Sequence, residues 1–264
     1  MSLDDGNYTG ALLMDLSKAF DAIPHGLLLA KLKAYGYNDD VLMLIRSYIS
    51  NRKQRVKVNE ARSEWSVINL GVPQGSILGP TLFNVFLNDL FLCMEETTIY
   101  NYADDNTISG TSHSLDGLVS MIETKGTDVT EWFTCNGMKA NPDKYQAIIF
   151  GSLTQAPSSL TIMGIHVPCQ DSVNLLGITI DSDLNFNSQA NLMCKKASKQ
   201  VNAMMRLHRV LDVEAKKAIY HSFIYSNFTY CPVLWLMCSK TSFLKIEAIH
   251  RRALKFLYND FHSS

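Results

Sequence analysis

The chain has 264 residues, of which 47% are hydrophobic and 19% are charged, and its formal net charge is −1. This length and composition suit a globular α/β domain with a smaller second unit, and they exclude the disordered class. The net charge hides an asymmetry, because residues 1–190 carry 12 basic against 21 acidic side chains, whereas residues 191–264 carry 12 against 4. The acidic part suits metal binding, and the basic part suits either a phosphate backbone or a solvated helical face.

The six cysteines form no C-x-x-C pair and have no nearby histidine at zinc spacing. No apolar run approaches the ~18 residues of a membrane span, and the N-terminus lacks a signal pattern. We therefore expect an intracellular protein with reduced thiols that is neither secreted nor bound to a membrane.

The first part of the chain mixes short apolar segments with helical patterns. In chain order, these patterns predict a buried strand over 10–16 that reaches Asp15, helices over 27–35 and 39–50, strands over 54–58 and 65–70, and an apolar helix over 81–94. Residues 98–108 predict a β-hairpin with Asp104 and Asp105 at its tip, because Asp and Asn suit a tight turn.

The second part continues with one long helix and then separates into strands and helices. The patterns predict a helix over 114–135 that Gly126 weakens, strands over 144–150, 160–165 and 174–180, and helices over 188–211, 213–227 and 241–258. Strands mixed with helices, followed by helices alone, indicate two units that meet near residues 185–190.

Three acidic side chains are the strongest chemical signal in the sequence. Asp15, Asp104 and Asp105 each follow apolar residues at an expected strand end, where a charge is costly unless a cation or water compensates it. Carboxylate oxygens suit hard divalent ions, and such a pocket can hold two Mg²⁺ roughly 3.5–4 Å apart during phosphoryl transfer. The alternative is that these residues are ordinary surface acids. We favour polymerase chemistry.

A glycine-rich segment lies between these acids. Gly71-Val-Pro-Gln-Gly-Ser-Ile-Leu-Gly-Pro80 has three glycines and two prolines in ten positions and leads into the apolar helix. Glycine permits close approach of the backbone to a ligand, and proline fixes the turn. A turn that opens a helix presents free N–H groups to anionic or base-edge partners.

Taken together, three segments resemble the reverse transcriptases of non-LTR (LINE-type, jockey-like) retrotransposons. They are Asp-Leu-Ser-Lys-Ala-Phe-Asp at 15–21, the glycine-rich segment at 71–80 and Tyr-Ala-Asp-Asp at 102–105, in that order. The resemblance implies an α+β fold: a right-hand polymerase palm over 1–187, with an antiparallel sheet packed on helices, and an α-helical thumb-like region over 188–264. The fingers are expected to be largely missing, together with an endonuclease domain and a Cys/His-rich knuckle, as in a gene fragment or a decayed element copy.

The resemblance also implies a function, RNA-directed DNA polymerase (a nucleotidyltransferase). A primer 3′-hydroxyl would attack the α-phosphate of a dNTP with the help of two Mg²⁺, or Mn²⁺ in their place. Asp15 and Asp104 would bind the metal ions, with Asp105 as a weaker or alternating ligand. The partners would be an RNA template, a DNA primer or target, and dNTP. The location would be the nucleus or a cytoplasmic ribonucleoprotein. The sequence makes no prediction of oligomeric state.

By the same resemblance, several residues would form the nucleotide site. Phe20 would reject a 2′-hydroxyl, although a phenylalanine is more often plain core. Leu16 and Ser17, with Lys18, would offer backbone N–H groups to the triphosphate. Gln74 and Gly75 would contact the templating pair, although Pro-Gln-Gly is also a plain turn sequence.

Other positions leave two interpretations open. Lys144 would protonate the leaving pyrophosphate, or it is an exposed strand-edge lysine. Asp21 matches an acid of the first motif, and we expect a structural role for it. Leu175-Leu176-Gly177 resembles a primer-grip turn without its usual aromatic residue. Basic residues on two predicted helices would contact phosphates: Lys195, Lys196, Lys199, Arg206 and Arg209 on one, and Arg251, Arg252 and Lys255 on the other.

Two alternative functions remain. The chain can be a catalytically inert truncated remnant that at most binds nucleic acid. It can also be a group II intron maturase or a retron enzyme, which would share the palm. The run Ser76-Ile-Leu-Gly-Pro80 favours LINE-type elements over this last alternative.

Overall fold

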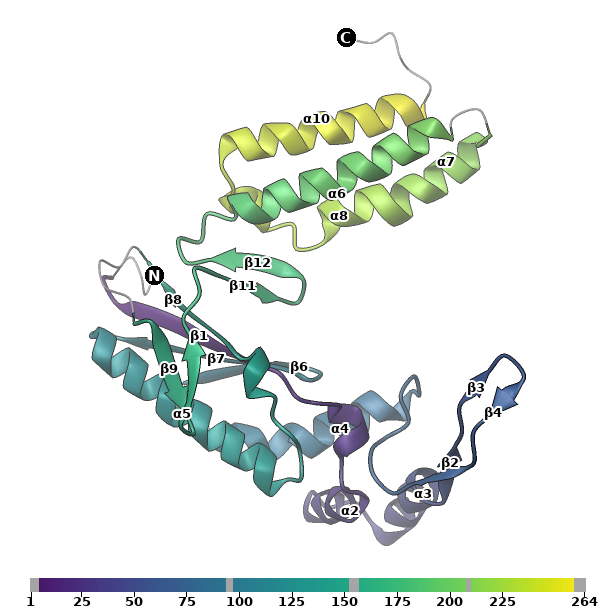
Figure 1. The fold of residues 1–264 in the computed structure, drawn as a ribbon, viewed down its shortest axis with the longest axis vertical. Helices are drawn as coiled ribbons and strands as arrows, with labels where there is room; N and C mark the ends of the chain where they lie inside the picture. The colour runs from purple at the N-terminus through teal and green to yellow at the C-terminus, as the bar shows by residue number, and fades with distance from the viewer. Residues whose placement is uncertain (1–4, 94–96, 152–156, 208–209, 259–264) are drawn as a thin grey trace. The chain divides into compact units, whose positions relative to one another are not determined.

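The structure is a computed structural model in which residues 5–93, 97–151, 157–207 and 210–258 are described. The chain divides into two compact units, Met1–Gln170 and Asp171–Ser264 (Figure 1). The predicted boundary at 187/188 falls instead at the start of the first helix of the second unit. The structure groups the hairpin at 172–181 with the helices, because its second strand packs against the first of them.

A four-stranded antiparallel sheet forms the centre of the first unit. Its order is β6-β7-β1-β8, with bounds β1 Tyr8–Met14, β6 Thr98–Tyr102, β7 Asp105–Ser112 and β8 Gln146–Phe150. Ala11, Leu12 and Met14 of the central strand β1 are buried. The register sets Met14 opposite Asn106, so that the end of β1 meets the start of β7. The predicted strand and hairpin are both present here.

The long helix α5 (Leu115–Cys135) packs against β1 and β7. The Ser114 side chain caps the helix by accepting from the N–H of Gly117 at 3.1 Å. Gly126 does not interrupt the helix, although the sequence predicted a weak point there. A Cβ at Gly126 would lie 2.7 Å from both Leu12 and Ile162, so this glycine lets the helix pack closely on its neighbours.

The remaining helices of the first unit share the same hydrophobic core. They are α1 (Ala19–Ala22), α2 (His25–Ala34), α3 (Asp39–Ile49), α4 (Leu78–Leu87) and the 3₁₀ segment η1 (Asn88–Cys93). A second 3₁₀ segment, η2 (Pro142–Lys144), has no buried residue. The predicted helix over 81–94 begins earlier, at Leu78, and changes to 3₁₀ geometry after Leu87. Position 94 lies outside the described residues. Neither α1 nor η2 was predicted, because both are too short to show a helical period.

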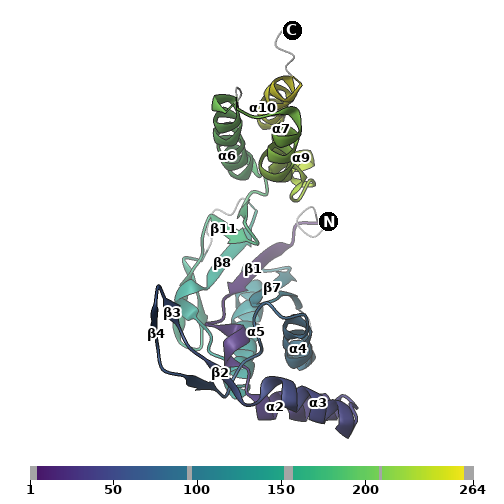
Figure 2. The ribbon, with the colours of Figure 1, turned by 90° about the vertical axis from the view of Figure 1, so that its right-hand side faces the viewer.

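Several predicted single strands are in fact hairpins. The 54–58 and 65–70 segments form two nested pairs, β2 (Arg52–Gln54) with β5 (Ser66–Ile68) and β3 (Lys57–Val58) with β4 (Ala61–Arg62). Figure 2 shows β2 close to α2, and β3 and β4 farther along the same ribbon. The 160–165 segment belongs to the hairpin β9 (Ser159–Ile162) and β10 (Ile165–Pro168). Its turn residues Met163 and Gly164 both have positive φ, and this turn was missed in the sequence.

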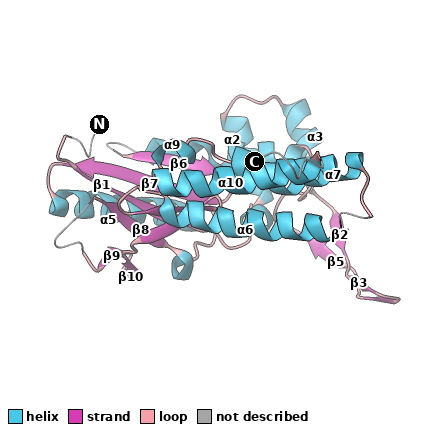
Figure 3. Cartoon of the chain, turned by 90° about the horizontal axis from the view of Figure 1, so that it is seen from above, coloured by secondary structure: helices cyan, strands magenta, loops and turns pink. Residues whose placement is uncertain are grey.

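The second unit combines one hairpin with helices. Its elements are β11 (Ser172–Leu175), β12 (Ile178–Asp181), α6 (Asn187–Arg206), α7 (Val213–Ile219), the π-helical turn η3 (Tyr220–Tyr225), α8 (Ser226–Thr229), α9 (Leu234–Met237) and α10 (Lys240–Leu257). Helices α6 and α10 lie side by side (Figure 3) and share a core that includes Val201, Ala253 and Phe256. The predicted helix over 213–227 is divided into the three segments α7, η3 and α8, because the π turn changes the helical phase.

Candidate active site

The β6–β7 hairpin and the end of β1 bring three carboxylates together. Tyr102 pairs with Asp105, so Ala103 and Asp104 form a two-residue turn. Asp15 follows Met14, whose partner Asn106 is the next residue after Asp105. The pKa of Asp105 is raised, first by burial and then by the negative charges of Asp104 and Asp15. The three acids that the sequence singled out are thus neighbours that repel one another.

Two asparagines hold the tip of this hairpin. The amide of Asn101 donates to Ala103 O at 3.1 Å and to Asn106 Oδ1 at 2.7 Å, and the amide of Asn106 donates to Asp104 O at 2.9 Å. Ala103 has a φ of 54°, the left-handed region that costs a non-glycine residue energy, and these bonds offset that cost. Sequence analysis did not assign this role to Asn101 and Asn106. The signal was an asparagine on each side of Tyr-Ala-Asp-Asp.

A second loop reaches Asp15 from residues 139–144. The N–H of Asn141 donates to Asp15 O at 3.0 Å, and Lys144 Nζ lies 3.1 Å from Asp15 Oδ2. The Lys144 side chain is 64% exposed. It belongs to the 3₁₀ segment η2 and not to a strand edge, because β8 begins only at Gln146. The structure therefore brings Lys144 into the carboxylate cluster.

The backbone after Asp15 is less open than the sequence suggested. The N–H of Ser17 donates to Lys139 O at 2.9 Å. That N–H is not free to bind a phosphate in this conformation, which corrects the expectation for Ser17. Leu16 is only 3% exposed, and its side chain belongs to the core of the first unit.

The glycine-rich segment 71–80 is docked on the end of the first motif. The N–H of Gly71 donates to Ile23 O and the N–H of Val72 donates to Phe20 O, both at 2.8 Å. Gly71 has a φ of 79°, and a Cβ there would lie 2.6 Å from the Cα of Asp21, so glycine is required. This contact holds the exposed residues Gln74 and Gly75 beside the first motif.

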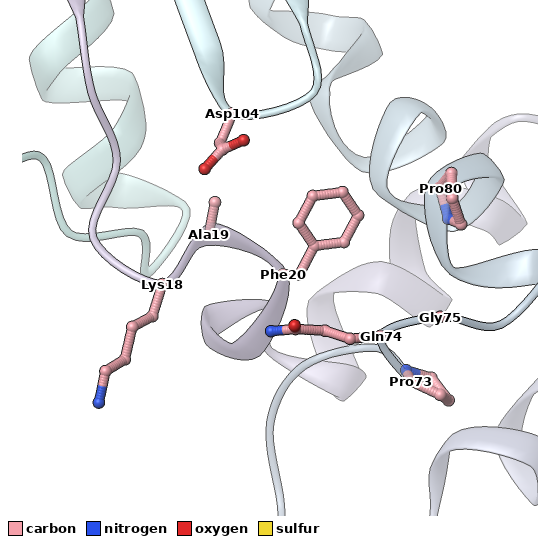
Figure 4. Close-up of a pocket in the computed structure, with 8 residues that line it drawn as sticks. All are labelled: Lys18, Ala19, Phe20, Pro73, Gln74, Gly75, Pro80 and Asp104. Atoms are coloured by element: carbon pink, nitrogen blue, oxygen red, sulfur yellow. The ribbon is translucent and has the colours of Figure 1, made fainter. Parts of the chain in front are cut away.

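A pocket of about 340 Å³ lies between these segments (Figure 4). Its lining comes from all three motifs: Lys18, Ala19, Phe20, Pro73, Gln74, Gly75, Pro80 and Asp104. In Figure 4 the Phe20 ring lies between the Asp104 carboxylate and the Gln74 side chain. The ring stacks on Phe83, with centroids 4.3 Å apart, so it is both a core residue and a pocket wall.

Gln74 is itself held in place. Its amide nitrogen donates to both carboxylate oxygens of Asp21, at 2.9 and 3.0 Å. The structural role expected for Asp21 therefore has a concrete form, which is to fix the side chain of Gln74 at the pocket. Sequence analysis could not pair these two residues, which are 53 positions apart.

The donor chemistry of the cluster fits a divalent cation. Among the described residues no three His, Cys, Asp or Glu side chains are already arranged as a metal site. The oxygens of Asp15, Asp104 and Asp105 are nevertheless of the type that Mg²⁺ prefers. Burial first, and then the negative charges of Asp104 and Asp15, raise the pKa of Asp105, and a bound cation would relieve the repulsion among these charges.

Residues 2–180 match the family model described as reverse transcriptase (RNA-dependent DNA polymerase). The chain belongs to this family. It is 25% identical over 266 residues to the probable RNA-directed DNA polymerase from transposon BS of Drosophila melanogaster, and 25% identical over 264 residues to the RNA-directed DNA polymerase from mobile element jockey of Drosophila funebris. Each match covers 96% of this chain and 29% of the relative, so the chain spans less than a third of the length of these relatives. The resemblance to non-LTR retrotransposon enzymes is confirmed.

A solved structure of apo telomerase from Candida tropicalis has a similar fold. The TM-score is 0.50 at 11% sequence identity, and the match covers 95% of this chain and 47% of the telomerase chain. At this identity the likeness concerns the fold alone, a mixed α+β architecture with antiparallel sheets. Within the described ranges, none of the helices is long and apolar enough to cross a membrane.

Proposed function

We propose that this chain carries the catalytic centre of an RNA-directed DNA polymerase, which joins a dNTP to a primer 3′-hydroxyl and releases pyrophosphate. The observation that carries the proposal is the gathering of Asp15, Asp104 and Asp105 beside the pocket that Phe20 and Gln74 line. Membership of the reverse transcriptase family supports it.

The carboxylates would hold Mg²⁺, or Mn²⁺ in its place, through Asp15 and Asp104, with Asp105 beside them. The bound ions would lower the pKa of the attacking hydroxyl and stabilise the leaving oxygens. Lys144, which is 3.1 Å from Asp15, would carry the proton for the leaving pyrophosphate.

The pocket walls would select and orient the nucleotide. The stacking of Phe20 on Phe83 would hold its ring against a sugar that enters the pocket, and a 2′-hydroxyl would then be rejected sterically. Asp21 would keep the Gln74 amide at the site of the templating pair, next to Gly75. Positioning of this kind supplies much of the acceleration in phosphoryl transfer.

The two units would correspond to a palm and a thumb-like region, with the boundary at Gln170/Asp171. An RNA template and a DNA primer or target would be held mainly through their phosphates. The basic residues of α6 and α10 support this assignment, although they also suit a solvated face. An intracellular location, in the nucleus or a cytoplasmic ribonucleoprotein, belongs to the same proposal, and the similarity to a transposon polymerase supports it.

The test is incorporation of dNTP by the purified protein on a primed RNA template in the presence of Mg²⁺. Asp104→Asn is expected to lower incorporation by about 100-fold or more, because it removes a metal ligand. Asp183→Asn is the matched control, since Asp183 is an exposed acid of the second unit. Full activity of Asp104→Asn would refute the proposed centre. RNA binding that needs no metal, without incorporation by the unmodified chain, would assign the alternative of an inert nucleic-acid-binding remnant.

A further inference from the structure

The nested hairpins at 52–68 form a ribbon that contributes nothing to the core of the first unit. All its residues from Lys53 to Val67 are exposed. Figure 1 shows β3 and β4 at the outer end of this ribbon, beyond β2. The ribbon is nevertheless well defined, because Ser63 N donates to Val56 O and Val56 N donates to Ser63 Oγ, both at 2.9 Å. Since two strands without a covering layer are marginal in water, a partner is expected to stabilise it.

The charge of the ribbon is opposite to that of the rest of its unit. Basic residues outnumber acidic ones: Arg52, Lys53, Arg55, Lys57 and Arg62 stand against Glu60 and Glu64. Within the described part of the chain, none of these five basic side chains forms an ion pair, whereas residues 1–190 as a whole are strongly acidic. Unpaired cations on an acidic unit indicate an anionic partner at this place.

An aromatic side chain stands among these charges. Trp65 is 57% exposed, and the guanidinium of Arg55 lies 4.5 Å from the centre of its ring. Most exposed positions have no reason to carry a tryptophan, which is usually well buried. An exposed indole next to a guanidinium offers one surface for stacking a base and one cation for the neighbouring phosphate. A base must be unpaired to stack there, which favours a single strand over a duplex.

The ribbon leads into the candidate active site. The lining of a cavity of about 760 Å³ includes Arg52, Gln54 and Val67 of the ribbon together with Lys18, Asp21 and Gln74. Lys18 and Gln74 also line the smaller pocket of the candidate active site. A chain of nucleotides that binds the ribbon therefore has a continuous path toward the pocket of Phe20 and Asp104.

We propose that the 52–68 ribbon binds a single-stranded polynucleotide, with phosphates on Lys53, Arg55 and Lys57 and a base stacked on Trp65, and guides it toward the active site. The inference rests on the proposed function for the identity of this strand as the polymerase substrate. Binding itself requires neither metal nor dNTP, so it can be measured apart from catalysis.

The experiment measures binding of the full chain to fluorescein-labelled 20-nucleotide RNA, by anisotropy at several salt concentrations without divalent metal. The variant Lys53→Gln/Arg55→Gln/Lys57→Gln is expected to reduce the slope of log K against log salt by about 2, since each phosphate contact on a single strand contributes about 0.7. Its control is Lys33→Gln/Arg46→Gln, two exposed cations of α2 and α3 in the same unit, which should leave the slope unchanged. Trp65→Ala should weaken binding by about tenfold.

The same measurement is made with a DNA strand of the same sequence. If the ribbon recognises phosphates and bases, each variant should lose as much affinity for DNA as for RNA. A loss confined to RNA would indicate recognition of the ribose. Thermal unfolding of each variant should match the unmodified chain, because the ribbon lies outside the core. Wild-type affinity of both ribbon variants would overturn the proposal and leave the ribbon as a protein-contact surface. If the unmodified chain fails to incorporate dNTP but the ribbon variants still lose strand binding, the proposed function fails while the inference about the ribbon stands.

Discussion

Lys31 is a buried lysine that joins α2 to the end of α4, the helix that follows the glycine-rich segment. It is only 8% exposed. Its ammonium group donates to Phe86 O at 2.9 Å and to Asp89 Oδ1 at 2.7 Å, and it lies 4.4 Å from the ring centres of both Phe86 and Trp132. Burial lowers the pKa of Lys31, and its hydrogen bond to the Asp89 carboxylate opposes that shift.

We expect Lys31→Ala to destabilise the first unit strongly. Removing one partner of a buried ion pair costs about 3–5 kcal/mol, and because the Asp89 side chain is 32% exposed, water reduces this to about 2–4 kcal/mol. Lys31→Met also leaves Asp89 and Phe86 O without their donor, but it keeps the alkyl packing against the two rings, so its cost should lie at the lower end of that range, about 2 kcal/mol.

The assay is urea unfolding followed by the fluorescence of Trp132, in a Trp65→Phe/Trp235→Phe background that leaves it as the only tryptophan. This probe reports on the first unit, so unfolding of the second unit does not enter the result. Lys33→Ala is the matched control on the same helix: its partner Asp39 is 3.8 Å away and both side chains are exposed, so its effect should stay below about 1 kcal/mol. Equal effects of Lys31→Ala and Lys33→Ala would refute the reasoning.

Three further predictions concern the turn, the acids and the second unit. Gly71→Ala places a Cβ 2.6 Å from Asp21 Cα. Gly75 also has a positive φ but open space around it, so Gly75→Ala should cost about 1–2 kcal/mol and Gly71→Ala should cost more. Equal losses of stability in urea unfolding would contradict this. The raised pKa of Asp105 means that the folded state binds its proton more tightly than the unfolded state, so metal-free stability falls as pH rises from 3.8 through the folded pKa. Asp105→Asn should therefore raise the metal-free melting temperature at pH 7, and an unchanged or lower value would oppose the prediction. Burial lowers the pKa of His250 below 6.5, so stability of the second unit should be lost as pH falls below 6.5; His250→Gln should weaken that loss in melts followed by circular dichroism, and an unaltered pH dependence would count against it.

Local patterns were sufficient where an element is long or periodic. The apolar run before Asp15, the hairpin with Asp104 in its turn and Asp105 directly after it, and the long helix at 115–135 all follow from side-chain periodicity and turn residues. Short elements were missed or merged. The turns at Met163-Gly164 and Leu176-Gly177 each divide an expected strand into a hairpin. The first turn was missed, because two residues of positive φ leave little trace in a hydrophobic pattern, and the second was noted only through its resemblance to a primer-grip turn.

By itself, the sequence determined the family, the three acidic side chains and the order of the motifs, since each of these depends on residue types within a few positions of one another. Tertiary structure alone decided which distant groups meet. Three contacts join segments more than fifty residues apart. They are the ion pair of Lys144 with Asp15, the hydrogen bonds of Gln74 to Asp21, and the hydrogen bond from the Ser17 N–H to Lys139 O. Such contacts depend on strand register and helix packing, which are set by burial over the whole unit and not by the residues beside each partner.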